Sequence, residues 1–295
     1  IMKPISPREL DEALLKLEKA LRRMRVLGDP VAEDQRWRLA ALGLSPDLFA
    51  TSLGTVGGGN HFCELPTLAE AEECTGLDTT RLYLLVHSGS RGVGSAVLGD
   101  VPQAAVAGLG SEHEAARAYL QDHDRAVRWA SLNRQMIAER AAEALRADLR
   151  VLVDAPHNLL EQHKGGWLHR KGAAVAKQGY VPLAGSRASA SYLISSANHP
   201  DALSSLAHGA GRRYDRGSMH GRLRAKRSDI EAMQRTPFGG RILCEDRDLL
   251  IEEAPLAYKS SKAVVDDLDR TGAGRHVAVF HPLLTFKKTR DGGWS

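Results

Sequence analysis

The stretch Gly54-Thr-Val-Gly-Gly-Gly-Asn-His-Phe-Cys-Glu64 marks the point where this 295-residue chain changes character. Before it, apolar residues recur at helical spacing from Pro7 to Leu27, and a second short helix is expected over Glu33–Leu42. After it, short apolar runs alternate with segments rich in glycine, serine and histidine. The glycine run therefore separates a helical N-terminal segment from a region of mixed structure.

Beyond the glycine run, the apolar segments indicate both strands and a long helix. Leu82–Val86 and Val151–Val153 are short and β-prone, and we expect both to be buried strands. Leu249–Ile251 and His276–Phe280 are two further strand candidates. Between the first two, Glu112–Asp148 has the longest helical pattern, as one helix or two joined helices.

The chain has no internal repeat, coiled coil or low-complexity linker that would divide it. We therefore expect an α+β (mixed α/β) fold in one large domain of short strands packed with helices. Residues 1–50 would be its helical N-terminal segment, and residues 51–295 would form its main part.

The composition is that of an ordinary globular protein, with 43% hydrophobic and 26% charged residues. No stretch approaches the roughly 18–20 apolar residues of a membrane helix, and the first residues lack the apolar core of a signal peptide. The three cysteines form no CxxC pair, which is typical of reduced thiols. We expect a cytoplasmic monomer without a membrane partner.

Basic residues concentrate in one segment, although the net charge is only +4. Between positions 212 and 227 a single acid, Asp215, faces eight basic residues if His220 is protonated. The eight are Arg212, Arg213, Arg216, His220, Arg222, Arg224, Lys226 and Arg227. Such a cluster can hold phosphates electrostatically, or it can be a solvated loop without a ligand. Charge alone leaves both interpretations open.

Four of the twelve histidines, His61, His87, His157 and His208, lie next to small or flexible residues. Loops on a rigid scaffold often present functional groups in such settings, and imidazole is a good ligand for Mn, Zn, Fe or Cu. None of the four has the i, i+4 spacing of a helical metal motif, so spacing does not establish convergence. A single histidine is more often structural, but the four together favour chemistry.

Any bound nucleotide must use an unusual cradle, because the chain has no P-loop and no strand–GxGxxG–helix unit. Three small-residue segments are candidates: Gly57–Asn60, Gly185–Arg187 and Gly209–Arg212. Their backbone amides allow close approach of a ligand, and arginine suits bidentate phosphate contacts. A tight turn without any ligand is the simpler use of the three consecutive glycines.

Taken together, seven segments resemble the signature blocks of the RtcB-type RNA ligase family, in family order and over most of the chain. They are Gly54–Glu64 (GxxGGGNHFxE), His87–Gly94 (HSGSRGxG), His157-Asn158, His169–Ala173 (HRKGA), Gly185–Tyr192 (PGSMGTASY), Ser205–Arg212 (SHGAGR) and Pro282–Lys287 (PxxxxK). The resemblance implies a catalytic domain over residues 51–295.

The resemblance also implies an activity. The expected enzyme joins RNA 3′-phosphate or 2′,3′-cyclic phosphate ends, in broken tRNA or other RNA, to 5′-hydroxyl ends. Its cofactors would be GTP and Mn²⁺, with two manganese ions in the complete enzyme. His208 would be the catalytic nucleophile that accepts GMP, and His61, His87 and His157 would bind manganese. The guanine nucleotide would be held by Asn60, Glu64, Asn158, Gly185, Ser186, Ser191, Gly209, Ala210, Gly211 and Lys287.

The chain departs from the family pattern in three places. No DxxCG segment, which supplies an Asp and a metal-bridging Cys in the family, precedes Gly54. Together with the initial Ile1, this predicts an N-terminally truncated chain that is slow or inactive alone, or else a degenerate homologue. Ala184 replaces the usual Pro. Arg187 replaces the usual Met, which points to the branch encoded beside release factor H.

Two other functions remain open at this point. A histidine-rich metal-dependent phosphohydrolase would bind metal without forming a guanylylated His208. A non-catalytic RNA-binding homologue would use only the basic segment at 212–227. Incubation with labelled GTP and Mn²⁺ separates these classes from the ligase.

Overall fold

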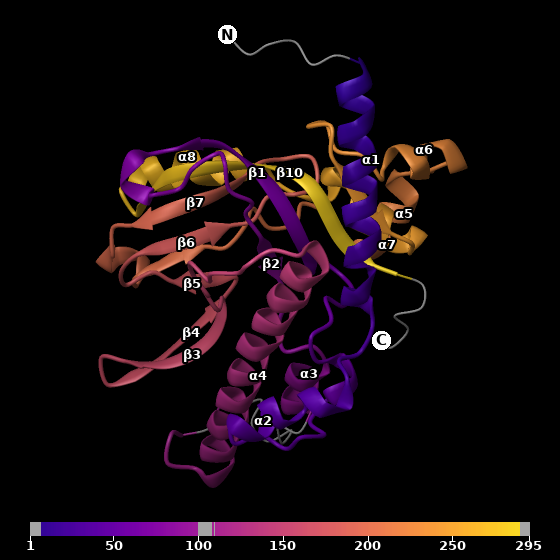
Figure 1. The fold of residues 1–295 in the computed structure, drawn as a ribbon. Coiled ribbons are helices and arrows are strands. Elements are labelled where there is room, and N and C mark those ends of the chain that lie inside the picture. The colour runs from indigo at the N-terminus through magenta and orange to yellow at the C-terminus, as the bar shows by residue number, and fades with distance from the viewer. Residues whose placement is uncertain (1–6, 100–107, 109, 290–295) are drawn as a thin grey trace.

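The computed structural model of the chain describes residues 7–99, 108 and 110–289. Within these ranges a curled, largely antiparallel sheet carries helices on both of its sides (Figure 1). This arrangement confirms the expected α+β fold. The boundary at residue 50 stays a prediction, and its two segments include positions 1–6, 100–107, 109 and 290–295, which lie outside the described residues.

The main sheet is built around one long strand, β10 (Gly274–Lys288). The strand order is β2-β1-β10-β7-β6, and β9 pairs with β10 in parallel. The other strands are β1 (Phe62–Ala71), β2 (Leu85–His87), β6 (Tyr180–Leu183), β7 (Ser191–Ser196) and β9 (Arg241–Cys244). Because β1 pairs with β10 along most of its length, the glycine run before β1 lies near the C-terminal half of β10.

Two small two-stranded sheets lie beside the main one. The hairpin of β3 (Asn158–His163) and β4 (Gly166–Lys171) forms the first, and β5 (Ala173–Val175) pairs with β8 (Ser205–Ala207) in the second. Only Gly172 separates β4 from β5. The two pairings therefore bring the segment before β3 and the segment after β8 next to Gly172.

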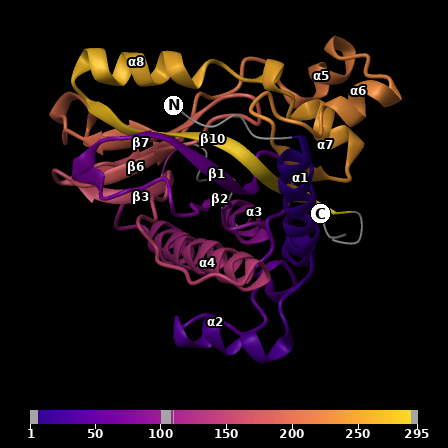
Figure 2. The same cartoon turned by 45° about the horizontal axis from the view of Figure 1, so that its top comes forward.

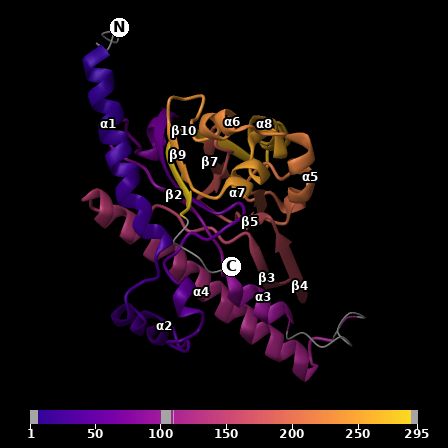
Figure 3. The same ribbon diagram turned by 90° about the vertical axis from the view of Figure 1, so that its right-hand side faces the viewer.

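Helices α4 (Glu114–Leu145) and α8 (Ser261–Thr271) lie on opposite sides of the sheet (Figure 2). Helix α1 (Pro7–Arg23), with the 3₁₀ turn η1 (Met24–Gly28), runs along the edge of the molecule and meets α4 (Figure 3). Apolar side chains fill the space between η1, α4 and the sheet. They include Met24, Leu27, Val56, Cys63, Ile137, Ala141 and Phe286. Burial of these side chains supplies the main driving force that holds the sheet on α4.

The remaining N-terminal elements pack on the other end of α4. They are η2 (Glu33–Gln35), α2 (Trp37–Ala41), η3 (Ala50–Ser52) and, after β2, α3 (Gly92–Gly99). Leu39 and Leu53 pack with the fully buried Trp129 of α4 in one cluster. None of the helices in the described ranges combines the length and apolar character required to cross a bilayer.

Three short helices gather at the C-terminal end of β9 and β10 (Figure 1). These are α5 (Arg216–Arg222), α6 (Arg227–Ala232) and α7 (Arg247–Glu252), and the turns η4 (Glu73–Thr75), η6 (Pro200–Ala202) and η7 (Pro255–Ala257) complete the described elements. Met219 of α5 packs against Ile251 of α7 and Ala257. This packing fixes the chain that leads from α7 into the candidate site.

Two strand predictions are wrong. Val151–Val153 forms no strand, and Val151 and Leu152 are 59% and 54% exposed, so their β-prone side chains have no sheet to join. Leu249–Ile251 belongs to helix α7, because the Asp246 side chain accepts a hydrogen bond from the Leu249 amide and caps the helix N-terminus. A run of three apolar residues fits a buried helix as well as a strand.

The other predicted elements are confirmed, with shifted ends. Pro7–Leu27 is α1 continued by η1, and Glu33–Leu42 contains η2 and α2. Glu112–Asp148 is one continuous helix, α4, and His276–Phe280 lies within β10. Of Leu82–Val86, only the end belongs to β2, which includes His87 itself.

Candidate active site

Strand pairing brings the first two predicted histidines together. His61 directly precedes β1, and His87 is the last residue of β2. Because Phe62 pairs with His87 across the two strands, the ring centroids of His61 and His87 lie 6.0 Å apart. The two rings meet edge to face.

The other two histidines meet around Gly172. The Ala173 amide donates to the carbonyl oxygen of His157 at 3.2 Å, and Ala173 pairs with Ala207, next to His208. The imidazoles of His157 and His208 are stacked, with centroids 3.8 Å apart. A hairpin turn and a strand pair thus place side by side two histidines that are 51 positions apart in the sequence.

One nitrogen from each of His87, His157 and His208 lies within 4.8 Å of the other two, a spacing at which three imidazoles can surround one metal ion. The Nε2 atoms of His87 and His157 are 3.2 Å apart. The sequence predicted a group of His61, His87 and His157, and in the group with metal-ligand spacing the structure has His208 beside His87 and His157. His61 joins the group through its ring contact with His87.

Burial keeps three of these imidazoles uncharged. It lowers the pKa of His61 and of His157 to about 4, and it lowers the pKa of His87 well below its ordinary value. At neutral pH each therefore offers a lone pair. The Nδ1 atoms of His61 and His157 are buried and have no hydrogen-bond partner among the residues that the structure describes. A cation ligated by these nitrogens would satisfy them, so the donor set fits a transition-metal ion, the class to which manganese belongs.

His208 differs from its neighbours because its Nδ1 atom has a partner. This atom lies 2.7 Å from the carbonyl oxygen of Gly172. A carbonyl oxygen only accepts, so Nδ1 carries the proton and Nε2 keeps its lone pair. His208 is thus held as the tautomer in which Nε2 is a nucleophile or a ligand.

A pocket opens beside His208 at the ends of β1, β6, β8 and β10. Most of the nucleotide-binding residues predicted from the sequence line it. These are Asn60, Glu64, Gly185, Ser186, Gly209, Ala210, Gly211 and Lys287, together with His87 and His208. Asn158 and Ser191 do not line it. Their side-chain oxygens instead accept the backbone amides of Gly172 and Gly185, both at 3.0 Å.

Glycine is required at position 185 by the close approach of backbone. A Cβ atom there would lie 2.2 Å from the carbonyl oxygen of Ala190, which no side-chain movement can relieve. The loop closes further because the Ser186 amide donates to Ser189 Oγ at 2.7 Å. Ala184 anchors the loop to the nucleophile segment, since its amide donates to the carbonyl oxygen of His208 at 2.8 Å.

The glycine run 57–59, one of the three candidate cradles, makes room for two arginine side chains. Gly57 and Gly59 both have positive φ, at 89° and 66°. A Cβ on Gly57 would overlap the Arg91 guanidinium, and one on Gly59 would lie 3.1 Å from Nη2 of Arg216. These glycines therefore form tight turns that admit two arginine side chains.

Glu64 of β1 and Lys287 of the adjacent strand β10 are both buried in the pocket, and their side chains can carry opposite charges. Glu64 is 4% exposed and accepts a hydrogen bond from Thr285 at 2.7 Å. Burial raises the pKa of Glu64 to about 7, although Thr285 and Lys287 oppose this shift. Burial lowers the pKa of Lys287, and Glu253 opposes that change. Glu64 thus sits near its ionisation point at neutral pH, ready to accept hydrogen bonds from a ligand.

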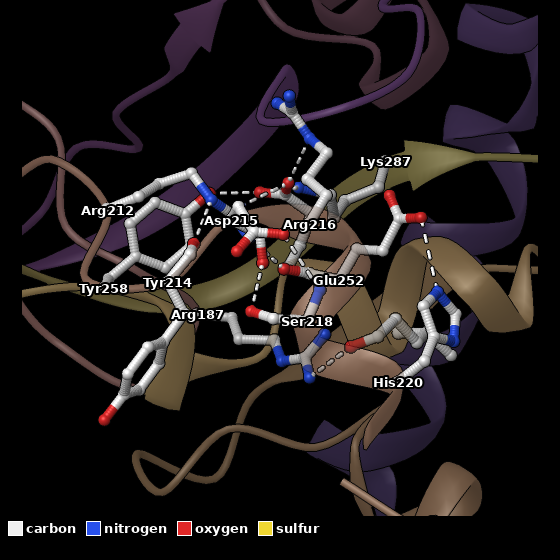
Figure 4. Close-up of polar contacts among 12 residues, drawn as sticks. Arg187, Arg212, Tyr214, Asp215, Arg216, Ser218, His220, Glu252, Tyr258 and Lys287 are labelled. Carbon is white, nitrogen blue, oxygen red and sulfur yellow. Dashed lines mark hydrogen bonds and ion pairs between the residues drawn. The ribbon is translucent and has the colours of Figure 1, made fainter. Parts of the chain in front are cut away.

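A charged network lines the pocket and is centred on the buried carboxylate of Glu253. Figure 4 shows Arg212, Arg216 and Lys287 of this network. Arg212 and Arg216 contact this carboxylate at 2.9 and 3.2 Å, and Lys287 lies 3.9 Å from it. The Tyr258 hydroxyl also donates to it. Three cations therefore surround one carboxylate, and the network as a whole has excess positive charge.

Arg212, which the sequence suggested for phosphate contacts, has several partners within the protein. Its guanidinium donates to Glu253 and to the carbonyl oxygens of Tyr214 and Glu252, and it lies 5.2 Å from the ring centroid of Tyr258. The sequence offered no sign of Glu253, which lies outside every small-residue loop. Thr285 could have been found by placing Pro282–Lys287 in a strand, where every second residue shares a face with Lys287.

The rest of the basic segment divides between paired and exposed groups. Arg222 lies 3.8 Å from the centroid of the Tyr214 ring, and His220 lies 3.4 Å from Glu252. Arg213 and Arg224 are exposed. Asp215 is the helix cap of α5 and accepts the Ser218 amide at 2.9 Å. The segment is thus partly structural and only partly a free basic surface.

Comparison with known proteins matches this site to one family. The family model described as tRNA-splicing ligase RtcB matches residues 46–288. RNA-splicing ligase RtcB2 of Escherichia coli (strain ATCC 25922) is 40% identical over 276 residues, which are 88% of this chain and 72% of that protein. RNA-splicing ligase RtcB of E. coli K12 is 30% identical over 249 residues, covering 72% of this chain and 56% of that protein.

A more distant relative covers less of its own length. The tRNA-splicing ligase RtcB of Methanocaldococcus jannaschii is 27% identical over 289 residues, which are 80% of this chain but 29% of that protein. The family match spans β1 through β10 and every histidine of the site. This chain therefore belongs to the tRNA-splicing ligase RtcB family.

Proposed function

We propose that this protein is an RNA ligase that joins RNA 3′-phosphate or 2′,3′-cyclic phosphate ends to 5′-hydroxyl ends, with GTP as co-substrate and manganese as metal. The observation that carries the proposal is the setting of His208. Its Nδ1 is hydrogen-bonded to the Gly172 carbonyl, and its ring stacks on His157 and lines the pocket. That arrangement supports attack on a phosphorus atom held between metal and pocket.

In the first step, His208 Nε2 attacks the α-phosphorus of GTP. A phosphorus–nitrogen bond forms, the bond to the bridging oxygen of the β-phosphate breaks, and pyrophosphate leaves. The Gly172 carbonyl stabilises the positive charge that develops on the imidazole, because it accepts the Nδ1 proton throughout. The product is a GMP phosphoramidate on His208.

We assign manganese to His61, His87 and His157. Their imidazoles are neutral and partly buried, and two of them have Nδ1 atoms without a hydrogen-bond partner among the described residues. His208 is adjacent to this group, but its fixed tautomer and pocket position favour the role of nucleophile. Bound manganese would neutralise phosphate charge and orient the phosphoryl group.

The pocket is assigned to the guanosine part of GTP. Guanine presents two adjacent donors, N1–H and the 2-amino group, and the Glu64 carboxylate can accept both. The backbone of Gly209–Gly211 lets the nucleotide lie close to the chain next to His208. Asn158 and Ser191 act indirectly in this scheme, since each holds a backbone amide of the site.

The RNA steps follow from the chemistry of the phosphoramidate. Water first opens a 2′,3′-cyclic phosphate to the 3′-phosphate. An oxygen of that phosphate then attacks the GMP phosphorus and releases His208, which activates the RNA end. The 5′-hydroxyl oxygen of the second RNA finally attacks the 3′-phosphorus, and GMP leaves as the strand is sealed.

A ligation assay tests this function with the protein expressed from its complete gene. One RNA ends in a 2′,3′-cyclic phosphate and the other begins with a 5′-hydroxyl, with GTP and Mn²⁺ present. The proposal predicts a joined product that is absent with His208→Ala. A phosphohydrolase would remove the end phosphate without joining, and a non-catalytic homologue would bind both RNAs unchanged. Cytoplasmic location and the monomeric state stay predictions.

A further inference from the structure

Two consecutive residues of helix α4, Asn133 and Arg134, bond to the loops that carry the histidine cluster and have no part in the proposed mechanism. The helix contacts both β2 and β3 (Figure 1). Asn133 is fully buried, and the side chain of Arg134 is only 16% exposed. Buried polar groups almost always have partners, and the partners of these two residues show which parts of the site α4 holds.

The oxygen of the Asn133 side chain holds the loop that leads to His61. The Gly54 amide, seven residues before His61, donates to Asn133 Oδ1 at 2.7 Å. Because a backbone N–H only donates, this contact fixes the orientation of the side-chain amide and leaves Nδ2 to donate elsewhere. Asn133 Oδ1 therefore anchors the start of the His61 loop to α4.

The nitrogen of the same amide holds the loop that follows β2. Asn133 Nδ2 lies 3.1 Å from Ser88 Oγ and 3.3 Å from the carbonyl oxygen of Gly89, and its two N–H groups suffice for both. Ser88 Oγ in turn donates to the Val56 carbonyl at 3.1 Å, which joins this loop to the loop before β1. A Cβ atom on Gly89 would lie 3.8 Å from Nε2 of His61, so the two loops also meet at the imidazole.

Arg134 holds the third loop, which leads to His157. Its Nε and Nη2 donate to the two carboxylate oxygens of Asp154 at 2.5 and 2.8 Å, and its Nη1 donates to the Ser88 carbonyl oxygen at 3.3 Å. Asp154 lies three residues before His157, and Pro156 restricts the backbone between them. One guanidinium thus joins the His157 loop to the loop after β2.

These contacts meet on a helix whose position is fixed by apolar packing on either side of them. Trp129 is fully buried in a cluster with Leu39, and Ile137 is fully buried in a cluster with Met24 and Phe286. Loops that are held on such a rigid element lose little conformational entropy when they bind a ligand, which increases the affinity. One turn of α4 can therefore order three loops that are distant in the sequence.

We propose that Asn133 and Arg134 are positioning residues, which hold the loops of His61, His87 and His157 so that the three imidazoles converge before a metal ion binds. The inference rests on the proposed function, because it takes these histidines as metal ligands. Neither positioning residue contacts the ion in this scheme. Both act through the backbone and the side chains of the loops.

Calorimetric titration with Mn²⁺ of the protein expressed from its complete gene tests the inference. Asn133→Ala and Arg134→Met should each weaken Mn²⁺ binding about tenfold, as do changes in other groups that orient metal ligands. Leu39→Ala is the matched control, because Leu39 is fully buried against α4 but makes no side-chain hydrogen bond to the loops. It should lower the melting temperature and leave the Mn²⁺ affinity unchanged.

Ser88→Ala keeps the test decisive if Asn133→Ala does not fold, because it removes only the hydroxyl that joins the two loops. This variant should also weaken Mn²⁺ binding. Co²⁺ gives a second readout, since the visible absorption of the bound ion depends on the number and geometry of its ligands. The Co²⁺ spectrum should change in Ser88→Ala and Asn133→Ala and stay unchanged in Leu39→Ala.

Two results would overturn the inference. One is that the folded variants at Ser88, Asn133 and Arg134 match the unmodified protein in Mn²⁺ affinity and Co²⁺ spectrum. The other is that Leu39→Ala loses as much affinity as they do, which would make the loss an effect of stability. Absence of Mn²⁺ binding to the unmodified protein would instead overturn the metal assignment of the proposed function, and this inference with it.

Discussion

The Nδ1 atom of His208 lies 2.7 Å from the carbonyl oxygen of Gly172. Gly172 also donates its amide to Asn158 at 3.0 Å, and it is the single residue between β4 and β5. One backbone position thus fixes the tautomer of the candidate nucleophile and ties it to the segment that carries His157. The reactivity of His208 consequently depends on the backbone conformation of Gly172.

Gly172→Ala should slow GMP transfer to His208, while it lowers the unfolding free energy only slightly. Gly172 has φ 69°, and a Cβ atom there would lie 3.4 Å from Cε1 of His208, so the variant strains the backbone and crowds the imidazole. The strain should cost about 1–2 kcal/mol of unfolding free energy. Gly165→Ala is the matched control, since Gly165 has φ 79° and nothing within 4 Å. Equal transfer rates in both variants would contradict the role of Gly172.

Glu64→Gln should stabilise the ligand-free protein at high pH while weakening GTP binding. The folded protein raises the pKa of Glu64 from 4.5 to about 7. The unfolding free energy that the protonated form of Glu64 contributes is therefore fully present below pH 4.5 and is lost as the pH rises through about 7. Glutamine stays neutral and avoids this loss. The unfolding free energy of the variant relative to the original should rise by about 2–3 kcal/mol between pH 5 and pH 8.

Urea unfolding at the two pH values measures this difference, and other titrating groups cancel in the comparison. A difference independent of pH would show that Glu64 is ionised in the folded protein throughout the range. The GTP affinity of the same variant, measured at pH 8, then tests whether the carboxylate contacts the base.

His87→Ala should weaken manganese binding at least about tenfold, because His87 is the member of the cluster that contacts each of the other three histidine rings. Calorimetric titration with Mn²⁺ measures the change. His220→Ala is the control, since His220 lies on α5 near Glu252 and outside the cluster. Unchanged manganese affinity in His87→Ala would remove His87 from the metal site.

Arg212→Ala should lower the unfolding free energy and Arg213→Ala should not, although the two residues are adjacent. Loss of Arg212 removes a hydrogen-bonded partner from the buried Glu253, so it should lower the unfolding free energy by about 1–3 kcal/mol. Arg213 is exposed, and its loss should leave stability unchanged. If Arg213 contacts an RNA phosphate, its loss should lower the salt slope of RNA affinity by about one unit. An unchanged slope would make Arg213 part of a solvated surface.

Much of the fold was predictable because burial imposes periodic patterns on the sequence. The helical spacing of apolar residues predicted α4 and α1, and the apolar run at the start of β10 predicted that strand. Leu249–Ile251 failed because three residues do not distinguish a strand from one turn of helix. Val151–Val153 failed because β-prone residues form a strand only when a partner strand is present.

The candidate site was predictable only in part, because its residues were found by motif and not by packing. The blocks around His61, His87, His157 and His208 indicated the cluster, although spacing gave no distances. The tautomer of His208 depends on a carbonyl 36 positions away, and carbonyls carry no sequence signal. Glu253 could not be predicted for a similar reason. In the sequence, a single acid beside α7 resembles any surface acid, and only the structure places three cations around it.

The most direct test of the central claim is to locate GMP on the protein. The protein expressed from its complete gene is incubated with GTP and Mn²⁺, digested under alkaline conditions that preserve a phosphoramidate, and analysed by mass spectrometry. GMP should be found on the peptide that contains His208, with pyrophosphate released in equal amount, and His208→Ala should carry none. GMP on any other residue, or an undiminished yield in His208→Ala, would contradict the assignment of His208 as the nucleophile.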